Sequence, residues 1–198
     1  MEREIYDEDH EAFRDVVKEF VKRYASDEKR KQWDAAGEID RATMLAAGEA
    51  RIICLSVPEA LGGAGVLQDL QAAIDHAAKA SGGKVGIIGF CWGGLLTWRA
   101  ACLLDGLSAA IPYYGGGITA EEEIARQPKC PVMAHFGDQD HWIPMEGIEV
   151  FTKAHPEVEV HVYPANHGFN CDQRGSYNEA AAKLARERSL AFFAAKLA

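Results

Sequence analysis

The chain has 198 residues, of which 48% are hydrophobic and 26% are charged, and its formal net charge at pH 7 is −9. This length and composition are typical of one soluble globular domain, or of a domain with an appendage, that can bury a core. The negative charge argues against nucleic acid or an anionic membrane surface as a partner.

Membrane spans, leader sequences and disulfide frameworks are not indicated. No apolar run approaches the roughly 18 residues that a membrane helix needs, and the first residues (MERE) lack the basic and apolar regions of a signal peptide. The cysteines are odd in number and form no C-x-x-C pair, which fits reduced thiols better than disulfides or a zinc site. They are Cys54, Cys91, Cys102, Cys130 and Cys171. We therefore expect a cytoplasmic protein without a metal site.

The first part of the chain differs in pattern from the rest. After an acidic start at residues 7–9, apolar side chains from Phe13 to Tyr24 recur at helical spacing and predict an amphipathic helix. A charged break is then expected at 26–31, a loop at 33–39 and a second short helix at 41–49.

Residues 51–57 are ambiguous, because their β-branched content suits a strand while their position suits the end of a helix. Pro58 ends this segment in either case. The glycines of 62–65 predict a turn, and they do not open a dinucleotide-binding fingerprint.

From residue 66 onward, helical and strand-like patterns alternate. Strands are expected at 85–90, 109–114, 132–136 and 158–163, and helices at 66–80, 95–104, 119–126 with Thr119 as N-cap, 146–154, and from a capping box at Ser176 and Glu179 to about Lys196. The last strand has one polar face, formed by Glu159 and His161, and is therefore expected near a sheet edge. The alternation predicts an α/β fold, a parallel sheet with flanking helices, preceded by an N-terminal helical segment.

Residues 84–94 (KVGIIGFCWGG) have the strand, glycine-rich turn and helix of a nucleophile elbow, with Cys91 at the tip of the turn. There the positive end of the following helix favours a thiolate. The backbone N–H of Trp92 would form one half of an oxyanion hole. The alternative is a glycine-rich turn that carries a buried structural cysteine.

Two later segments favour the catalytic interpretation. A buried strand that ends at Phe136 runs into a loop with Asp140, and the strand that ends at Tyr163 runs into a loop with His167. The order nucleophile, acid, histidine, each past the carboxyl end of a predicted strand, is that of the α/β-hydrolase triad.

On three motifs, residues 66–198 resemble the dienelactone hydrolase family of α/β-hydrolases: residues 84–94, 137–141 (GDQDH) and 166–169 (NHGF). The resemblance implies Cys91 as nucleophile, His167 as its base and Asp140 as the acid that orients the imidazole. It also implies hydrolysis of a lactone or small ester through an acyl-cysteine. The family tends to carry an arginine shortly after the histidine, and Arg174 is the candidate here for binding a substrate carboxylate.

Residues 1–65 resemble the start of an acyl-CoA dehydrogenase, on residues 5–14, 33–37 and 57–65. The flavin and acyl-CoA contacts of that family come mostly from domains absent here, so no cofactor is expected. The chain therefore looks like a chimera of two domains, 1–65 and 66–198, joined near Gly65. An acyl-CoA-binding module is a further alternative for the first part.

The resemblance implies that the hydrolase part is truncated. In the family, the early strands, the second oxyanion donor and the charged substrate contacts come from the half that residues 1–65 replace here. The elbow strand would lie at an unprotected sheet edge. Either residues 51–57 join it as a fifth strand, or a second copy covers the edge, and we favour a homodimer. An inherited triad with little or no activity, in a scaffold or oligomerising module, is the alternative function.

Several other residues could belong to the site. Asp138 is the rival of Asp140, and His141 is expected to shape the pocket or lie at the surface. Cys171 follows His167 closely and could lie near the site. Three aromatic residues are candidates for lining the substrate pocket, although core packing would explain them equally well: Phe90, Tyr114 and Trp142.

Overall fold

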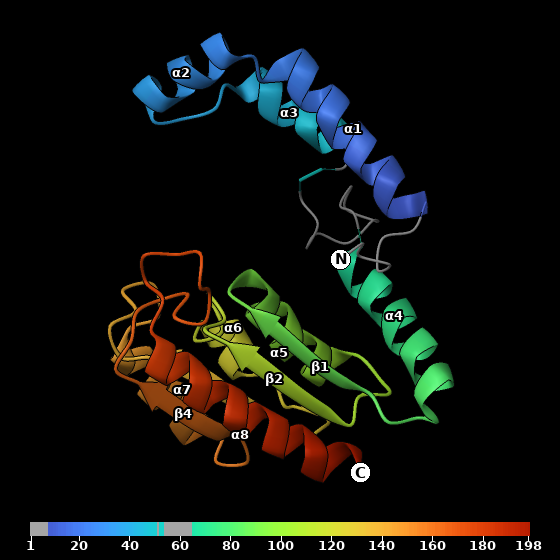
Figure 1. Cartoon of the computed structure of the whole chain (residues 1–198), viewed down its shortest axis with the longest axis vertical. Helices are drawn as coiled ribbons and strands as arrows, with labels where there is room; N and C mark the ends of the chain where they lie inside the picture. Colours follow the sequence, from blue (N-terminus) through green and yellow to red (C-terminus); the bar gives the residue numbers. More distant parts are fainter. Residues whose placement is uncertain (1–7, 51, 54–64) are drawn as a thin grey trace. The chain divides into compact units, whose positions relative to one another are not determined.

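The computed structural model describes residues 8–50, 52–53 and 65–198. The chain divides into two compact units, residues 1–66 and 67–198 (Figure 1). The assignment of the two parts to different families stays a prediction.

The described residues of the first unit form three helices, α1 (Glu8–Tyr24), α2 (Asp27–Ala36) and α3 (Arg41–Glu49). Helices α1 and α3 confirm the prediction from the sequence. Asp40 links α2 to α3, because its carboxylate accepts hydrogen bonds from Trp33 Nε1 at 3.0 Å and from the backbone N–H of Thr43 at 2.9 Å. The bonds from Thr43 are the main reason that the pKa of Asp40 lies well below its usual value.

Helix α2 contradicts the predicted break at 26–31 and loop at 33–39. Its ends are well defined, since the Ser26 side chain accepts a hydrogen bond from Lys29 N and Gly37 closes the helix with φ 72°. None of its residues is buried. Hydrophobic periodicity therefore gave no signal for a helix that depends on its caps and charged residues.

The second unit holds a sheet of four parallel strands in the order β1-β2-β3-β4 (Figure 1). Its elements are α4 (Val66–Ser81), β1 (Gly86–Phe90), α5 (Trp92–Leu103), β2 (Ala109–Tyr113), α6 (Glu121–Ile124), β3 (Met133–Gly137), α7 (Met145–Ala154), β4 (Glu159–Tyr163) and α8 (Glu179–Leu197). This is the predicted α/β architecture of a parallel sheet with flanking helices, and β4 lies at an edge as its polar face indicated.

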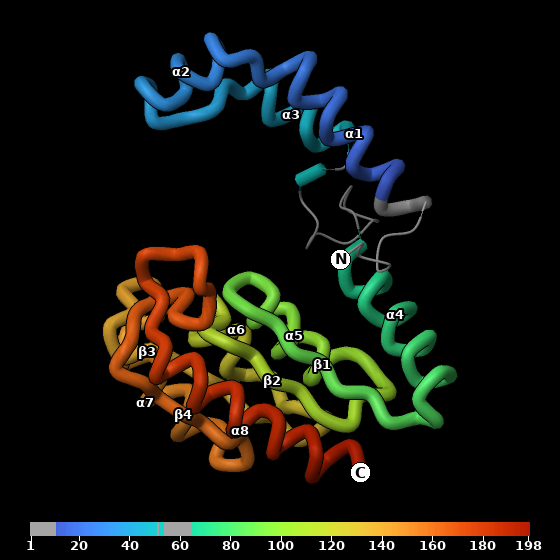
Figure 2. The backbone as a smooth tube through the Cα atoms, viewed as in Figure 1, coloured from blue at the N-terminus to red at the C-terminus, as the bar shows by residue number. Residues whose placement is uncertain are grey.

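Helices α5 and α8 cover opposite faces of the sheet, as the neighbours of two glycines show. A Cβ on Gly86 would meet Phe193 and Leu197 of α8, whereas a Cβ on Gly89 would meet residues of α5. Because side chains three residues apart on a strand point to opposite faces, the two helices lie on either side of β1. Helix α7 shares the α5 face, where the ring of Phe151 packs against that of Trp98. Figure 2 shows α8 lying over the sheet, roughly along the direction of β1 and β2.

A buried hydrogen-bonded cluster fastens α8 to the central strands. His135 on β3 lies 2.8 Å from the Tyr163 hydroxyl through Nδ1 and 3.0 Å from Ser189 Oγ on α8 through Nε2. The Tyr113 hydroxyl lies 2.7 Å from the same Ser189 oxygen. Burial, together with the neighbouring His161 and Arg188, lowers the pKa of His135 to about 3, which keeps its imidazole neutral.

Two predicted helix starts were wrong. The N-cap of α8 is Asn178, whose side chain accepts from Ala181 N at 3.1 Å, and not Ser176. The short helix α6 begins after Ala120 rather than Thr119 and ends at Ile124. In both cases the prediction chose the wrong N-cap among several polar or small residues that precede the helix. Neither error changes the topology.

The predicted fifth strand at 51–57 lies mostly outside the described residues. Of this segment the structure describes Ile52 and Ile53, which form a bend. Pro58 and most of the glycine turn at 62–65 also lie outside, and Gly65 is described with φ 71°. No helix in the described parts of the chain is long and apolar enough to cross a membrane.

Candidate active site

Cys91 occupies a sharp turn between β1 and α5, with φ 57° and ψ −120°. A positive φ is strained for a residue with a side chain, so the surroundings must hold it. The Cys91 N–H donates to Tyr113 O at 3.0 Å, and the Cys91 carbonyl accepts from Gly94 N and Leu95 N at 2.9 and 3.2 Å. The turn therefore closes on β2 at one side and begins α5 at the other, leaving the thiol at the tip.

Glycines allow α5 to approach the sheet closely enough to make this turn. A Cβ on Gly94 would lie 2.5 Å from Tyr113 O and 2.9 Å from Gly115 Cα, and a Cβ on Gly89 would collide with Gly93 O. A Cβ on Gly93 would meet nothing within 4 Å. Gly89 and Gly94 are thus required by packing, whereas Gly93 is not.

His167 bridges Cys91 and Asp140. Its Nε2 lies 3.1 Å from Cys91 Sγ, and its Nδ1 lies 2.7 Å from Asp140 Oδ2. The histidine and the carboxylate are buried, at 6% and 4% exposure, while the thiol is half-buried. The loops that follow β3 and β4 bring Asp140 and His167 to the same edge of the sheet as the elbow, because parallel strands end there.

The carboxylate of Asp140 is held by its own loop. Its Oδ1 accepts from Trp142 N at 2.9 Å and from Ile143 N at 3.3 Å, which leaves Oδ2 facing the histidine. Asp138, the rival candidate, is exposed on the same loop. The structure thus brings Asp140 to His167, and a turn of the Asx type fixes the orientation of its carboxylate.

Aromatic rings surround the imidazole on two sides. Tyr114 packs edge to face against His167 with ring centroids 5.1 Å apart, and Trp142 does so at 4.9 Å. Tyr114 has φ 35° and is buried, and burial raises the pKa of its hydroxyl. Phe90 packs against the ring of Tyr113, with ring centroids 4.7 Å apart, and is 41% exposed.

The remaining predicted site residues lie around this centre. Trp92 is the first residue of α5, where backbone N–H groups have no partner within the helix. Arg174 is exposed and passes over Gly168, since its Cδ is 3.3 Å from where a Gly168 Cβ would lie. His141 is exposed and packs on Trp142, with ring centroids 4.3 Å apart.

Two contacts were not foreseen from the sequence. The Asn166 side chain accepts from the backbone N–H of His167 at 2.7 Å and so shapes the loop that carries the histidine. The polar residue directly before the histidine was the available signal. The Cys171 N–H donates to Gly168 O at 2.9 Å, which folds the following segment back towards the histidine loop.

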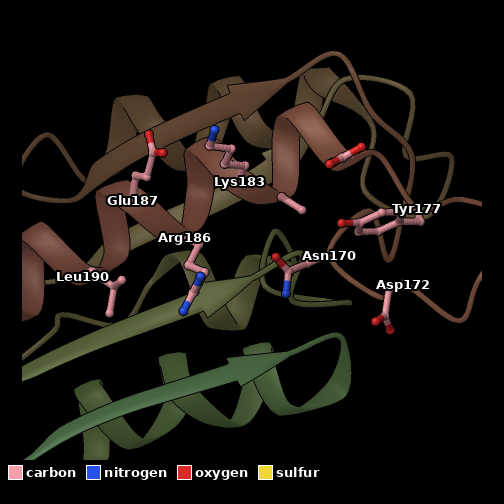
Figure 3. A pocket seen from close by; sticks show the side chains of 9 residues that line it. Asn170, Asp172, Tyr177, Lys183, Arg186, Glu187 and Leu190 are labelled. Atoms are coloured by element: carbon pink, nitrogen blue, oxygen red, sulfur yellow. The ribbon is translucent and has the colours of Figure 1, made fainter.

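A groove of about 480 Å³ runs along α8 beside this segment (Figure 3). Its lining is of mixed charge and contains none of the three residues Cys91, Asp140 and His167. The groove is formed by Asn170, Asp172 and Tyr177 of the segment and by Glu179, Ala182, Lys183, Arg186, Glu187 and Leu190 of α8. It is therefore a feature of the surface of α8 and is separate from the cluster of Cys91, Asp140 and His167. Among the described residues, no group of three or more histidine, cysteine or acidic side chains could hold a metal ion.

The fold is that of an α/β-hydrolase, and comparison with known proteins shows the family within this fold class. Residues 54–197 match the dienelactone hydrolase family, and the chain therefore belongs to that family. The match begins inside the segment expected to end at residue 65.

Carboxymethylenebutenolidases of Pseudomonas putida and Pseudomonas knackmussii are similar to this chain, each 37% identical over 132 residues. Each alignment covers 64% of this chain and 56% of the relative, so the chain spans about half the length of these curated relatives. A solved structure from Klebsiella pneumoniae, provisionally assigned as a dienelactone hydrolase, is 34% identical with a TM-score of 0.59. The alignment covers 70% of this chain and 62% of the Klebsiella pneumoniae chain.

A dienelactone hydrolase-like promiscuous phosphotriesterase from metagenomic libraries has a TM-score of 0.60 at 21% identity. The alignment covers 81% of this chain and 70% of that one. At this identity the likeness supports the common fold alone.

Proposed function

We propose that the protein hydrolyses small carboxylic esters or lactones through an acyl-cysteine, with Cys91 as nucleophile, His167 as base and Asp140 as orienting acid. The observation that carries the proposal is the position of His167, 3.1 Å from Cys91 Sγ and 2.7 Å from Asp140 Oδ2. Membership of the dienelactone hydrolase family supports the same reaction class.

In the first half-reaction, His167 Nε2 takes the proton of the Cys91 thiol while Nδ1–H donates to Asp140. The thiolate attacks the carbonyl carbon, and the N–H of Trp92 at the start of α5 stabilises the oxyanion. When the tetrahedral intermediate collapses, the ester C–O bond breaks and the leaving oxygen receives the proton from His167.

In the second half-reaction, water attacks the thioester and gives its proton to His167. The C–S bond then breaks, the acid leaves, and the Cys91 thiolate takes the proton back from His167. Both steps need the imidazole in one fixed orientation, which its bond to Asp140 provides.

The substrate class follows from the walls of the site and from the relatives. Phe90, Tyr114 and Trp142 offer apolar surface for a small ring, and Arg174 is placed over the histidine loop, where it would bind a carboxylate. The relatives named carboxymethylenebutenolidase support a small lactone. The absence of any C-x-x-C spacing among the cysteines supports a reducing, cytoplasmic environment.

An inherited triad with little turnover is the second candidate. The alignment covers 56% of the curated relative, and the second oxyanion donor of the family is expected from the part of the relative that is not matched. Loss of one such donor costs about 10²–10³ in turnover in other hydrolases. A scaffold or oligomerising role would then remain.

The test is hydrolysis of p-nitrophenyl acetate by the wild type, Cys91→Ala and the matched control Cys171→Ala. We expect steady turnover in the wild type and the control, and a loss of at least about 10³-fold in Cys91→Ala. A burst without turnover would favour the second candidate. Equal rates in all three proteins would overturn the proposal.

A further inference from the structure

Strand β1 is an edge strand in the described part of the sheet, where β2 is the one strand that pairs with it (Figure 1). Two hydrogen bonds show which groups face β2: Ser108 N donates to Val85 O at 2.7 Å, and Cys91 N donates to Tyr113 O at 3.0 Å. Because the direction of backbone groups alternates along a strand, those of the intervening even-numbered residues face away from β2. The N–H and C=O groups of Gly86, Ile88 and Phe90 thus form the open edge.

The two edges of the sheet are built differently. Strand β4 carries Glu159 and His161, joined at 2.8 Å, and such polar side chains protect an edge from pairing. Strand β1 (GIIGF) has no charged residue and no proline. Ile88 and Phe90, whose backbone groups face the edge, are 44% and 41% exposed. Only the β1 edge therefore lacks the features that prevent a further strand from adding to it.

We propose that a second copy of this chain pairs with β1 in the antiparallel sense, about a two-fold axis at Ile88, to form one continuous eight-stranded sheet. This register places Ile88 opposite the partner's Ile88, and Gly86 opposite the partner's Phe90. All three outward-facing residues then stand in hydrogen-bonded pairs, which exchange both N–H and C=O groups. A shift by one residue would lose this match, because the odd-numbered groups are already bonded to β2.

The side chains fit the same register. Residues opposite each other in an antiparallel pair lie on one face of the sheet, so Ile88 and Phe90 of both copies share the α8 face. The partner's Phe90 arrives beside Gly86, where Phe193 and Leu197 of α8 already occupy the space a Cβ would take. It thereby gains apolar neighbours that it lacks in a single copy, where its exposure is 41%. The interface is isologous, as in most dimers.

We infer a second copy of this chain at the edge from the hydrogen-bonding pattern and the apolar face of β1. This inference does not depend on the proposed chemistry. Sedimentation velocity of the full chain over a micromolar range should show a dimer. Ile88→Lys places two ammonium groups opposite each other at the two-fold axis and should raise the dissociation constant of the dimer at least tenfold. The circular dichroism spectrum should stay that of the wild type. The matched control Val162→Lys, on the β4 edge at a similar exposure of 39%, should leave it unchanged.

A cross-link tests the register. In a hydrogen-bonded antiparallel pair the Cα atoms lie about 5.5 Å apart, within the range of a disulfide. Ile88→Cys should therefore form an intermolecular disulfide with a mild oxidant such as oxidised glutathione, whereas Val162→Cys and the wild type should not.

Three results would overturn the proposal: a monomer throughout the concentration range, a dimer that Ile88→Lys leaves intact, or one that Val162→Lys dissolves. Slow hydrogen exchange at the Ile88 and Phe90 amides in a monomer would assign the edge to a segment of the same chain.

Discussion

The ring of Trp142 stands at 90° to that of His167, with centroids 4.9 Å apart, although Trp142 is 63% exposed. An exposed tryptophan is held there because its own backbone N–H donates to Asp140 Oδ1, the carboxylate that also binds the histidine. Asp140, Trp142 and His167 are therefore one linked unit.

Trp142→Ala should lower kcat/KM about two- to tenfold, because an edge-to-face ring contact contributes about 0.5–1.5 kcal/mol. Trp142→Phe keeps a ring at the position and should stay within about twofold of the wild type. The measurement is steady-state hydrolysis of the activated ester. Equal losses in both variants would show that the ring contact does not position the histidine.

Asp140→Asn should reduce kcat by up to about 10⁴-fold, because an amide cannot hold the imidazole in the required tautomer or stabilise its charged form. The fold should survive, since the remaining carbonyl oxygen can still accept from Trp142 N and Ile143 N. Asp138→Asn is the control on the same loop, and its rate should be that of the wild type. If Asp138→Asn were the slower variant, the assignment of the acid would be wrong.

Gly94→Ala should destabilise the fold by about 1–3 kcal/mol or more, because the added methyl would lie 2.5 Å from Tyr113 O. Gly93→Ala adds the same methyl one residue earlier, where nothing lies within 4 Å, and should be neutral or slightly stabilising. Urea denaturation followed by fluorescence would measure both. Equal stability of the two variants would contradict the close approach of α5 to β2.

The stability of the second unit, residues 67–198, should fall in acid because of His135. Burial lowers the pKa of His135 from 6.5 to about 3, so between these values the unfolded chain binds a proton that the folded chain excludes. The contribution of the neutral His135 to the free energy of unfolding is complete above pH 6.5 and is lost as the pH falls towards 3, by at most about 1.4 kcal/mol per pH unit.

The matched variant for this prediction is His135→Gln, which cannot titrate but retains hydrogen-bonding groups for Tyr163 and Ser189. Its free energy of unfolding should be lower than that of the wild type at pH 7, and the difference should shrink between pH 6.5 and 4. A difference that is constant with pH would mean that His135 does not titrate on unfolding.

The sheet and the proximity of Cys91, Asp140 and His167 could be predicted because each depends on a strong local pattern. Four apolar strands alternate with helices, and the nucleophile, acid and histidine each follow a strand, so parallel topology alone brings Cys91, Asp140 and His167 to one edge. Helix α2 was missed for the opposite reason. It buries none of its residues and depends on Ser26 and Gly37 as caps, which periodicity does not detect.

Other features of the site depend on tertiary structure. That Asn178 rather than Ser176 caps α8 depends on the path of the preceding segment, in which the Asn178 N–H donates to Phe169 O. The positive φ of Tyr114 follows from the end of β2, where its N–H donates to His135 O at 2.7 Å. No run of neighbouring residues carries that information.

The most direct test of the central claim, that Cys91 is acylated during turnover, is intact-protein mass spectrometry after rapid mixing with p-nitrophenyl acetate. We expect an added mass of one acyl group, mapped by proteolysis to the peptide that contains Cys91 and absent from Cys91→Ala. In His167→Ala it should form far more slowly. An adduct on another residue, or steady turnover in Cys91→Ala, would contradict the account.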